Sequence, residues 1–302
     1  MFSFHKLIAL AGSTRSWLFR YVSCYGLISS LLLATACADH LTPVPVGKEE
    51  LRQTAIRFYQ SLYSTDQTPV DIYIANGYTE HQVSAGFTLN GLKSFAQNRA
   101  KGQSVVIHRT LVQNDLVGLQ VEEKVLADSS VAHMVLLRFD AAGKIIDHWE
   151  AIQGQPRQRS NPNTMFDGTS VDYSSTIGSR SVDGVVITDQ RIYNQYDTLL
   201  VRQTRASDYI QHNPRAGNGA GPLIQLLAYL KSQGFRTTLT VYRTVAEGNF
   251  MLELNNYQTI PAFPGLTNSL TFDLTRLDET GKAAEHWDVQ EELGSVDKSK
   301  VF

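Results

Sequence analysis

The chain has 302 residues, of which 42% are hydrophobic, so it is long enough for two domains of ordinary size with a core each. The formal net charge is -2 and the sequence has no dense run of lysine and arginine, so it lacks the basic patch that is typical of a nucleic-acid-binding protein. Both cysteines, Cys24 and Cys37, precede residue 40, so the domains predicted below hold no disulfide and no cysteine-ligated zinc. We expect no metal and no cofactor.

Residues 1–38 have the layout of an export signal, in which an apolar run from Tyr21 to Leu33 follows basic residues and precedes small ones. Cleavage after Ala36 would leave Cys37 as the N-terminus, where a bacterial lipoprotein carries its lipid anchor. Ordinary secretion after Ala36 or Ala38 and an uncleaved anchor are the alternatives. We therefore expect an exported protein, periplasmic or membrane-anchored as a lipoprotein, otherwise secreted, that meets the membrane only through Cys37.

A tether at residues 39–47 leads into the first predicted domain, residues 48–160. Apolar residues at helical spacing predict helices at 48–63, 68–74 and 89–100. Turn residues separate the four strands predicted next, Ser104–Gln113, Leu116–Leu126, Val131–Asp140 and Lys144–Gln153. Helices followed by an antiparallel sheet indicate the α+β class, with the helices on one face of the sheet.

Residues 161–182 belong to a polar stretch with little periodicity, which we interpret as a linker to the second domain, residues 183–302. In that domain we predict a helix near Thr188–Arg205, a loop at Tyr209–Asn213 and a helix at Pro222–Gln233. The strands predicted there are Arg236–Ala246, Phe250–Gln258, Ser269–Asp278 and Lys282–Glu292. The polar tail after Gly294 should fray.

The two predicted domains carry one sequence pattern twice. Asp-His-Trp-Glu at 147–150 matches Glu-His-Trp-Asp at 285–288, and an acidic turn with Gly-Lys precedes each. Upstream segments match in the same order, at Tyr78 and Tyr209 and again at His108 and Tyr242. The spacing of the copies is far longer than a solenoid repeat, so the sequence predicts a tandem duplication of a whole domain.

Alternation along a strand places His286 and Asp288 on one face of the last strand and Trp287 on the other. In the first copy, His148 and Glu150 lie opposite Trp149 in the same way. We expect the acid and the imidazole to point into a dry pocket. Desolvation there favours the protonated carboxyl and moves its pKa toward neutrality, where proton abstraction next to a carbonyl is efficient.

The ordered motifs of the second copy resemble the SnoaL-like branch of the nuclear-transport-factor-2-like (NTF2-like) superfamily. They are Tyr209-Ile-Gln-His212-Asn213-Pro214, Tyr242-Arg243, Glu247-Gly248-Asn249, Asp273 ahead of Arg276, Gly281-Lys282 and Glu285-His286-Trp287-Asp288-Val-Gln290. The resemblance implies two tandem cone-shaped α+β barrels, each a curved, mostly antiparallel sheet wrapped around its N-terminal helices. The first copy is degenerate, since Glu150 stands in place of Asp288.

In the polyketide cyclases of that family the acid of the His-Trp-Asp strand is the acid and base of an intramolecular aldol closure. The resemblance therefore assigns catalysis to Asp288 with His286 beside it, in a metal-independent aldol cyclase, isomerase or hydrolase. Substrate would be bound by Tyr209, His212, Asn213, Tyr242, Asp273 and Gln290. The pocket of the first copy would be lined by Tyr78, His81, His148 and Glu150.

Other interpretations stay open at this point. The protein is such an enzyme, or a non-catalytic carrier that binds a small hydrophobic ligand in its pocket, or a purely structural protein whose cone is filled. Asp288 and His286 can equally form a structural hydrogen-bonded pair, and Asp273 can bridge to Arg276 or Arg243. Trp149 and Trp287 either bury against each other, with the two repeats packed as an internal pseudo-dimer, or are buried separately.

Overall fold

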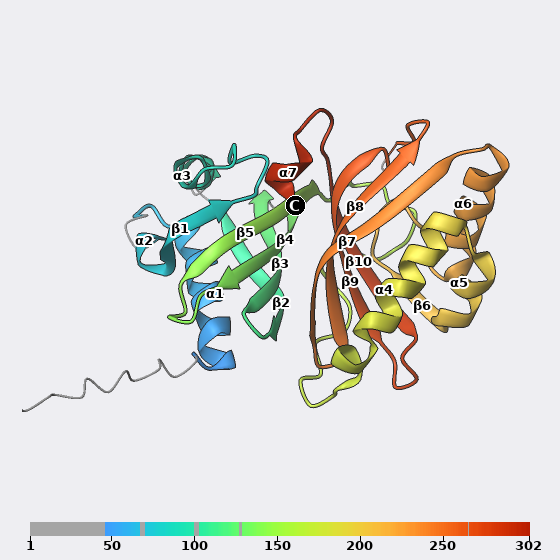
Figure 1. Ribbon diagram of the computed structural model, residues 1–302, viewed down its shortest axis with the longest axis horizontal. Helices are drawn as coiled ribbons and strands as arrows, with labels where there is room; N and C mark the ends of the chain where they lie inside the picture. The colour runs from blue at the N-terminus through green and yellow to red at the C-terminus, as the bar shows by residue number, and fades with distance from the viewer. Residues whose placement is uncertain (1–45, 67–69, 100–102, 127–128, 265) are drawn as a thin grey trace, which may run out of the picture. The chain divides into compact units, whose positions relative to one another are not determined.

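A computed structural model describes residues 46–66, 70–99, 103–126, 129–264 and 266–302 (Figure 1). The predicted export signal, the Cys37 anchor and most of the tether lie outside the described residues. Residues 43–302 form one compact unit, and the description below is confined to it. No helix within the described ranges is long and apolar enough to cross a membrane.

The N-terminal half of the described chain contains three helices and five strands. Their bounds are α1 Lys48–Leu62, α2 Val70–Tyr73, β1 Ile74–Glu80, α3 Leu89–Arg99, β2 Ser104–Gln113, β3 Leu116–Leu126, β4 Ser129–Phe139 and β5 Ile145–Gly154. The three helices and four antiparallel strands agree with the predicted ones to within about two residues at each end. Strand β1 was not predicted, because Asn76 and Gly77 interrupt its pattern and its pairing partner lies far along the chain.

The C-terminal half repeats this series. Its elements are α4 Ile177–Gln195, α5 Thr198–Thr204, β6 Arg205–Gln211, α6 Ala220–Ser232, β7 Arg236–Glu247, β8 Phe250–Ile260, β9 Asn268–Leu277, β10 Ala283–Glu292 and α7 Lys298–Val301. The strands predicted here are confirmed with small shifts at their ends.

Three predictions for the C-terminal half were wrong. Helix α4 begins at Ile177, inside the polar stretch, because Gly178 lets the first turn pack on the β7–β8 turn, where its N–H donates to Gly248 O at 3.0 Å. Strand β6 includes part of the expected loop, since it pairs in parallel with β10. The tail does not fray: Val301 is fully buried and the Phe302 ring stacks on Tyr242 at 4.2 Å.

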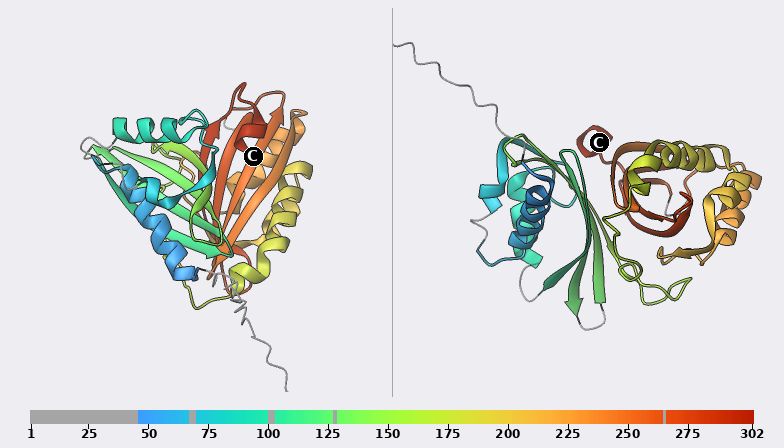
Figure 2. Two further views of the ribbon diagram at one scale, coloured as in Figure 1. Left: turned by 60° about the vertical axis from the view of Figure 1, so that its left-hand side comes forward. Right: turned by 90° about the horizontal axis from the view of Figure 1, so that it is seen from below.

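Both sheets have five strands in the same order. The N-terminal sheet runs β1-β5-β4-β3-β2 and the C-terminal sheet β6-β10-β9-β8-β7. In each sheet only the first strand of the order pairs in parallel, and the other neighbours are antiparallel. Figure 2 shows both sheets curving around the helices of their own half. The predicted α+β class is confirmed.

Each sheet has one helix-covered face and one face that belongs to a shared core. Phe58 and Leu92 pack on the N-terminal sheet from α1 and α3, and Ile192 and Leu227 pack on the C-terminal sheet from α4 and α6. We call these two regions the N-terminal interior and the C-terminal interior. The opposite faces contribute to one hydrophobic cluster that contains Trp149 and Trp287.

The two tryptophans have matching surroundings within this cluster. The Trp149 ring stacks on His81 at 4.5 Å, with the Arg243 guanidinium 5.3 Å from its centre. The Trp287 ring stacks on His212 at 4.5 Å, with the Arg109 guanidinium 4.2 Å away. Each indole therefore lies between an imidazole of its own half and a guanidinium of the other half.

Candidate functional site

Contacts along the last strand of each sheet confirm the predicted alternation of side chains. On β10, His286 and Asp288 make their hydrogen bonds on the helix-covered side, whereas Trp287 belongs to the shared cluster. On β5, His148 and Glu150 do the same. The acid and the imidazole of each copy therefore face an interior.

Three carboxyl groups cross the C-terminal interior in a line, which we call the acid row. Glu253 on β8 is in register with Asp273 on β9, and Asp273 is in register with Asp288 on β10. All three residues are buried, at 2%, 7% and 4% exposure respectively. Because neighbouring strands lie about 5 Å apart, the row extends over about 10 Å.

Asp273, in the middle of the row, has all its acceptors occupied. Its Oδ1 lies 3.0 Å from His286 Nε2. Its Oδ2 accepts hydrogen bonds from Asn255 Nδ2 at 2.7 Å and from the Tyr257 hydroxyl at 3.1 Å. Neither oxygen of Asp273 is therefore without a hydrogen-bond partner.

Both ring nitrogens of His286 lie against oxygen atoms of neighbouring side chains. Nδ1 lies 3.0 Å from Gln211 Oε1, an oxygen that also accepts the Asn213 N–H. Burial lowers the pKa of His286, but the hydrogen bond and the charge of Asp273 outweigh it, so the pKa is raised. Within the described chain no hydrogen bond joins His286 to Asp288, so the paired acid is Asp273. Nor does Asp273 bridge to an arginine, because Arg276 bonds Glu285 at 2.8 Å.

Asp288 keeps one oxygen free. Its Oδ2 accepts hydrogen bonds from Asn213 Nδ2 at 2.6 Å and from Gln290 Nε2 at 3.3 Å. Its Oδ1 is buried and has no partner among the described residues. Burial raises the pKa of Asp288 to about 6, with His286 opposing the shift and Asp273 adding to it. Near neutral pH this carboxyl can therefore both accept and return a proton.

Glu253, at the other end of the row, is held in its neutral form. Its Oε2 lies 3.2 Å from Asn255 Nδ2, whereas Glu253 Oε1 and Asn255 Oδ1 are buried without a partner in the described part of the chain. Burial raises the pKa of Glu253 well above its ordinary value, and the neighbouring Asp189 and Asp273 raise it further. Burial therefore favours the neutral form of Glu253.

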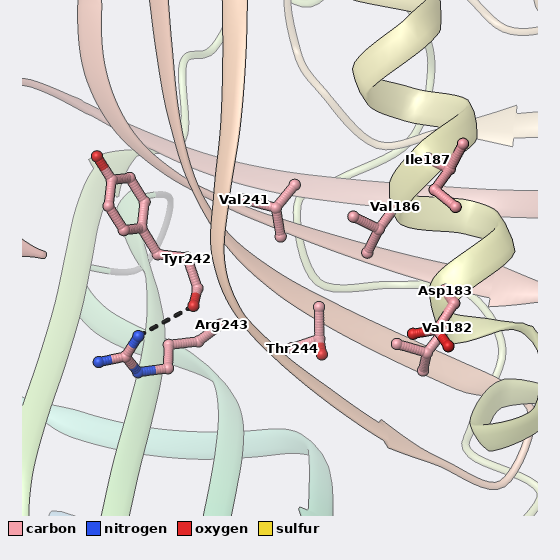
Figure 3. Close-up of a pocket in the computed structure, with 8 residues that line it drawn as sticks. All are labelled: Val182, Asp183, Val186, Ile187, Val241, Tyr242, Arg243 and Thr244. Carbon is pink, nitrogen blue, oxygen red and sulfur yellow. Dashed lines mark hydrogen bonds between the residues drawn. The ribbon is translucent and has the colours of Figure 1, made fainter.

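Solvent reaches the last-strand imidazole of the C-terminal interior but not that of the N-terminal interior. The His286 side chain is 16% exposed, whereas the equivalent His148 is 0% exposed. A cavity of about 450 Å³ lies between α4 and β7 (Figure 3), lined by Val182, Asp183, Val186, Ile187, Val241, Tyr242, Arg243 and Thr244. Val241 and Thr244 are in register with Asn255 and Glu253 on the next strand. The cavity therefore lies beside the Glu253 end of the acid row.

Four of the predicted substrate-binding residues lie around Asp288 and His286. Asp273, Asn213 and Gln290 make the contacts given above. Tyr209 lies on β6, and its hydroxyl accepts a hydrogen bond from Gln211 Nε2 at 3.4 Å. Burial raises the pKa of Tyr209, so its hydroxyl keeps its proton.

The structure places His212 and Tyr242 away from this group. His212 stacks on Trp287 and its Nε2 lies 2.9 Å from Glu285 Oε1, both on the shared face of the sheet. A β-bulge between Val241 and Arg243 turns Tyr242 to the side of β7 that faces away from α4 (Figure 3). Neither residue touches the acid row.

The N-terminal interior is closed by a buried network. Glu150 accepts hydrogen bonds from the Tyr59 hydroxyl at 2.7 Å and from Gln82 Nε2 at 2.6 Å. His133 lies between Glu150, at 2.6 Å, and Glu123, at 2.9 Å. Burial lowers the pKa of His133, but these two hydrogen bonds outweigh it, so the pKa is raised.

Three of the four residues predicted for this pocket belong to the network. His148 Nδ1 lies 2.9 Å from Glu80 Oε1. The Tyr78 hydroxyl donates a hydrogen bond to Oε2 of the same glutamate at 2.6 Å. His81 does not take part, because it stacks on Trp149 and its Nε2 bonds Asp147 at 3.0 Å. No described group of three or more His, Cys, Asp or Glu side chains is arranged to hold a metal.

The sequence interpretation missed several residues of the C-terminal interior. Glu253, Asn255 and Tyr257 alternate along β8 with residues of the shared cluster such as Leu252 and Leu254. This alternation of polar and apolar residues in a strand was the available signal. Gln211, which orients His286, carried no such signal because β6 was not predicted as a strand.

No protein-family model matches the chain, and no curated protein matches it. Solved structures match part of it. TsrD from Streptomyces laurentii is 18% identical, with 37% of this chain and 89% of that chain covered and a TM-score of 0.32. An LEH-like epoxide hydrolase from M. tuberculosis is 17% identical, with 39% and 85% covered and a TM-score of 0.31. IdmH from Streptomyces antibioticus, a proposed polyketide cyclase, is 15% identical, with 39% and 96% covered and a TM-score of 0.31. Similarity at this level says nothing about activity.

Proposed function

We propose that the C-terminal interior is an acid–base site for a small molecule and that Asp288 transfers the proton. The observation that carries this proposal is Asp288 Oδ1, a buried oxygen without a partner among the described residues, on a carboxyl whose pKa is about 6. The neighbouring His286 side chain is 16% exposed to solvent. A carboxylate of this basicity suits proton abstraction next to a carbonyl.

In the proposed reaction, Asp288 Oδ1 takes the proton from a carbon next to a carbonyl group and an enolate forms. The Tyr209 hydroxyl accepts a bond from Gln211, and no residue in the described ranges accepts its own proton. That proton is free to stabilise the enolate oxygen. Asp288 then returns its proton to the carbon skeleton, as an isomerase or an aldol-type cyclase requires. Asn213 positions Asp288, and His286 is hydrogen-bonded to Asp273 beside it.

The test uses exchange of α-hydrogens for deuterium, followed by NMR, over a panel of cyclic ketones and 1,3-dicarbonyl compounds. Asp288→Asn should slow exchange about 100-fold or more and leave binding of the same compounds within about threefold. The wild-type rate should rise as the pH passes through about 6. Asp208→Asn, an exposed aspartate on β6, is the matched control and should change nothing. Exchange at the wild-type rate in Asp288→Asn would overturn the proposal.

A non-catalytic carrier is the second candidate function. The apolar part of the cavity between α4 and β7, formed by Val182, Val186 and Val241, favours it. Under this alternative the compounds bind but no exchange occurs in the wild-type protein. The experiment above therefore separates the two functions.

We infer from the sequence motifs that both halves are SnoaL-like NTF2-like domains that arose by tandem duplication and pack as an internal pseudo-dimer. The identical strand orders support this inference, and so do the reciprocal stacks of Arg243 on Trp149 and Arg109 on Trp287. The leader sequence leads us to propose that the protein is exported.

A further inference from the structure

The connection between β8 and β9 begins with an exposed run of apolar residues. Ile260, Pro261, Ala262, Phe263 and Pro264 follow one another without a polar side chain. Phe263 is half-buried and the other four are exposed, Ile260 at 55%. Because exposed apolar residues in a row lower solubility, such a run is typical of a surface that a partner covers.

Aromatic rings join this run to the end of α6 and the start of β7. The centre of the Phe263 ring lies 5.4 Å from that of Phe235 and 6.4 Å from that of Tyr229. Tyr229, on α6, is 52% exposed. Arg236, the first residue of β7, is in register with Ile260. The run and these rings therefore form one continuous surface, which we call the apolar tip.

Helix α6 continues the apolar tip along the outer side of the C-terminal half (Figure 1). Between Gly221 and Leu230 its only polar side chains are Gln225 and Tyr229. A helix that is apolar on all sides is normally buried on all sides, yet Ala228 and Tyr229 are exposed. The composition of α6 therefore suits a helix with an apolar environment on its outer side as well.

The segments that form the apolar tip carry positive charge only. No Asp or Glu occurs in residues 209–246, and residues 254–272 contain no charged residue. Lys231 and Arg236 are exposed at the end of α6 and the start of β7. Two such surfaces repel each other, so a second copy of the chain is a poor occupant, whereas an anionic surface attracts both side chains.

The backbone of the apolar tip is suited to a medium without water. Pro261 and Pro264 have no N–H group that could be left unpaired. The Phe263 carbonyl accepts hydrogen bonds from the Leu266 N–H and the Thr267 hydroxyl, both at 2.9 Å. Unpaired backbone groups are costly in hydrocarbon, so this pairing lowers the cost of entering a lipid layer.

We propose that the apolar tip docks the protein on an anionic lipid membrane, with Ile260 between the acyl chains and Lys231 and Arg236 at the lipid phosphates. Stable attachment to a membrane usually takes two contacts, and the apolar tip adds one to the anchor expected at Cys37. Docking requires no chemistry at Asp288, so it is independent of the proposed function.

The test follows amide hydrogen exchange of the full chain by mass spectrometry, in buffer and on vesicles of phosphatidylcholine and phosphatidylglycerol in equal parts. Peptides that contain Ile260 and Phe263 should exchange at least about tenfold more slowly on the vesicles. Because each peptide is measured separately, protection of the apolar tip is distinguished from binding through the leader. Peptides from the core show in the same experiment that a variant is folded.

Ile260→Asp should abolish the protection, because it places a carboxylate among the acyl chains. Ile72→Asp, at an isoleucine of α2 that is 58% exposed, is the matched control and should behave as wild type. Replacing both Lys231 and Arg236 with glutamine should weaken vesicle binding at least about tenfold. Vesicles of phosphatidylcholine alone should bind the wild-type protein more weakly by a similar factor.

Unchanged exchange around Ile260 on the anionic vesicles would overturn the proposal, and so would wild-type protection in Ile260→Asp. Protection that grows with protein concentration without vesicles, together with a dimer in analytical ultracentrifugation, would assign the apolar tip to a second copy of the chain. Protection by polyglutamate but not by vesicles would assign it to an acidic protein. Either of these results would also overturn membrane docking.

Discussion

The two interiors share a strand order and the place of the last-strand acid and imidazole, yet they use buried charge in opposite ways. In the N-terminal interior, His133 lies between Glu123 and Glu150, and solvent reaches neither His133 nor His148. In the C-terminal interior, Glu253 and Asp288 lack an ion pair, and one oxygen of each has no hydrogen-bond partner among the described residues. A closed network serves stability, whereas unpaired acids with raised pKa values are typical of functional sites.

The cross-strand register explains the difference. The residues in line with Asp288 are Asp273 and Glu253, but those in line with Glu150 are Val135 and Leu119. The cross-strand line through Glu150 therefore has one acid, whereas the line through Asp288 has three. Helix α1 also brings the Tyr59 hydroxyl onto Glu150, so that acid has no free oxygen of the kind found on Asp288.

The largest expected effect comes from opening the closed network. His133→Leu removes the imidazole between Glu123 and Glu150 and should lower the free energy of unfolding by about 3–5 kcal/mol, because each of these two buried carboxyl groups loses its bond to the imidazole. Urea denaturation measures the loss. Thr271→Val changes the corresponding position of the C-terminal sheet and should cost only about 1 kcal/mol. Similar losses for the two variants would contradict the contrast between the interiors.

The native network should also show a pH dependence of known sign. The pKa of His133 is raised in the folded protein. Protonated His133 therefore adds its full stabilisation to the free energy of unfolding below the ordinary histidine pKa, and this stabilisation is lost as the pH rises through the raised pKa.

A second effect is expected for the acid row, where a substitution should stabilise the protein, unlike His133→Leu. The pKa of Asp288 is about 6 in the folded protein and lower in the unfolded chain, so the folded state binds this proton more tightly. The free energy of unfolding should therefore fall as the pH rises from about 4 to about 6. Asp288→Asn removes that loss and should stabilise the protein by up to about 3 kcal/mol at pH 8, with little change at pH 3. Thermal unfolding at the two pH values measures it, and destabilisation at pH 8 would show that Asp288 has a structural role.

The smallest effect concerns the two tryptophan stacks. Trp287 Nε1 donates to Asp167 O at 2.9 Å, whereas Trp149 Nε1 is buried without a partner among the described residues. Both Trp→Phe variants lose part of their stack on an imidazole, but only Trp287→Phe also loses a hydrogen bond. Trp287→Phe should therefore cost about 1 kcal/mol more than Trp149→Phe in urea denaturation. Equal costs would mean that the hydrogen bond of Trp287 contributes nothing net.

Local pattern was enough to predict most helices, the eight antiparallel strands and the faces of β5 and β10. These features depend on the periods of about 3.6 and 2 residues, which the backbone imposes on neighbouring side chains. For the same reason His286 and Asp288 could be assigned to one face and Trp287 to the other without coordinates. The sequence alone determined which residues of β10 face the interior.

Only the tertiary structure decided what those residues meet there. Register across β8, β9 and β10 places Glu253 and Asp273 in line with Asp288, and a bulge in β7 removes Tyr242 from the group. The parallel edge strands β1 and β6, on the other hand, depend on partners far along the chain. Pairing between distant segments has no local period. Single segments of the sequence therefore could not show that His286 pairs with Asp273 or that one oxygen of Asp288 has no partner among the described residues.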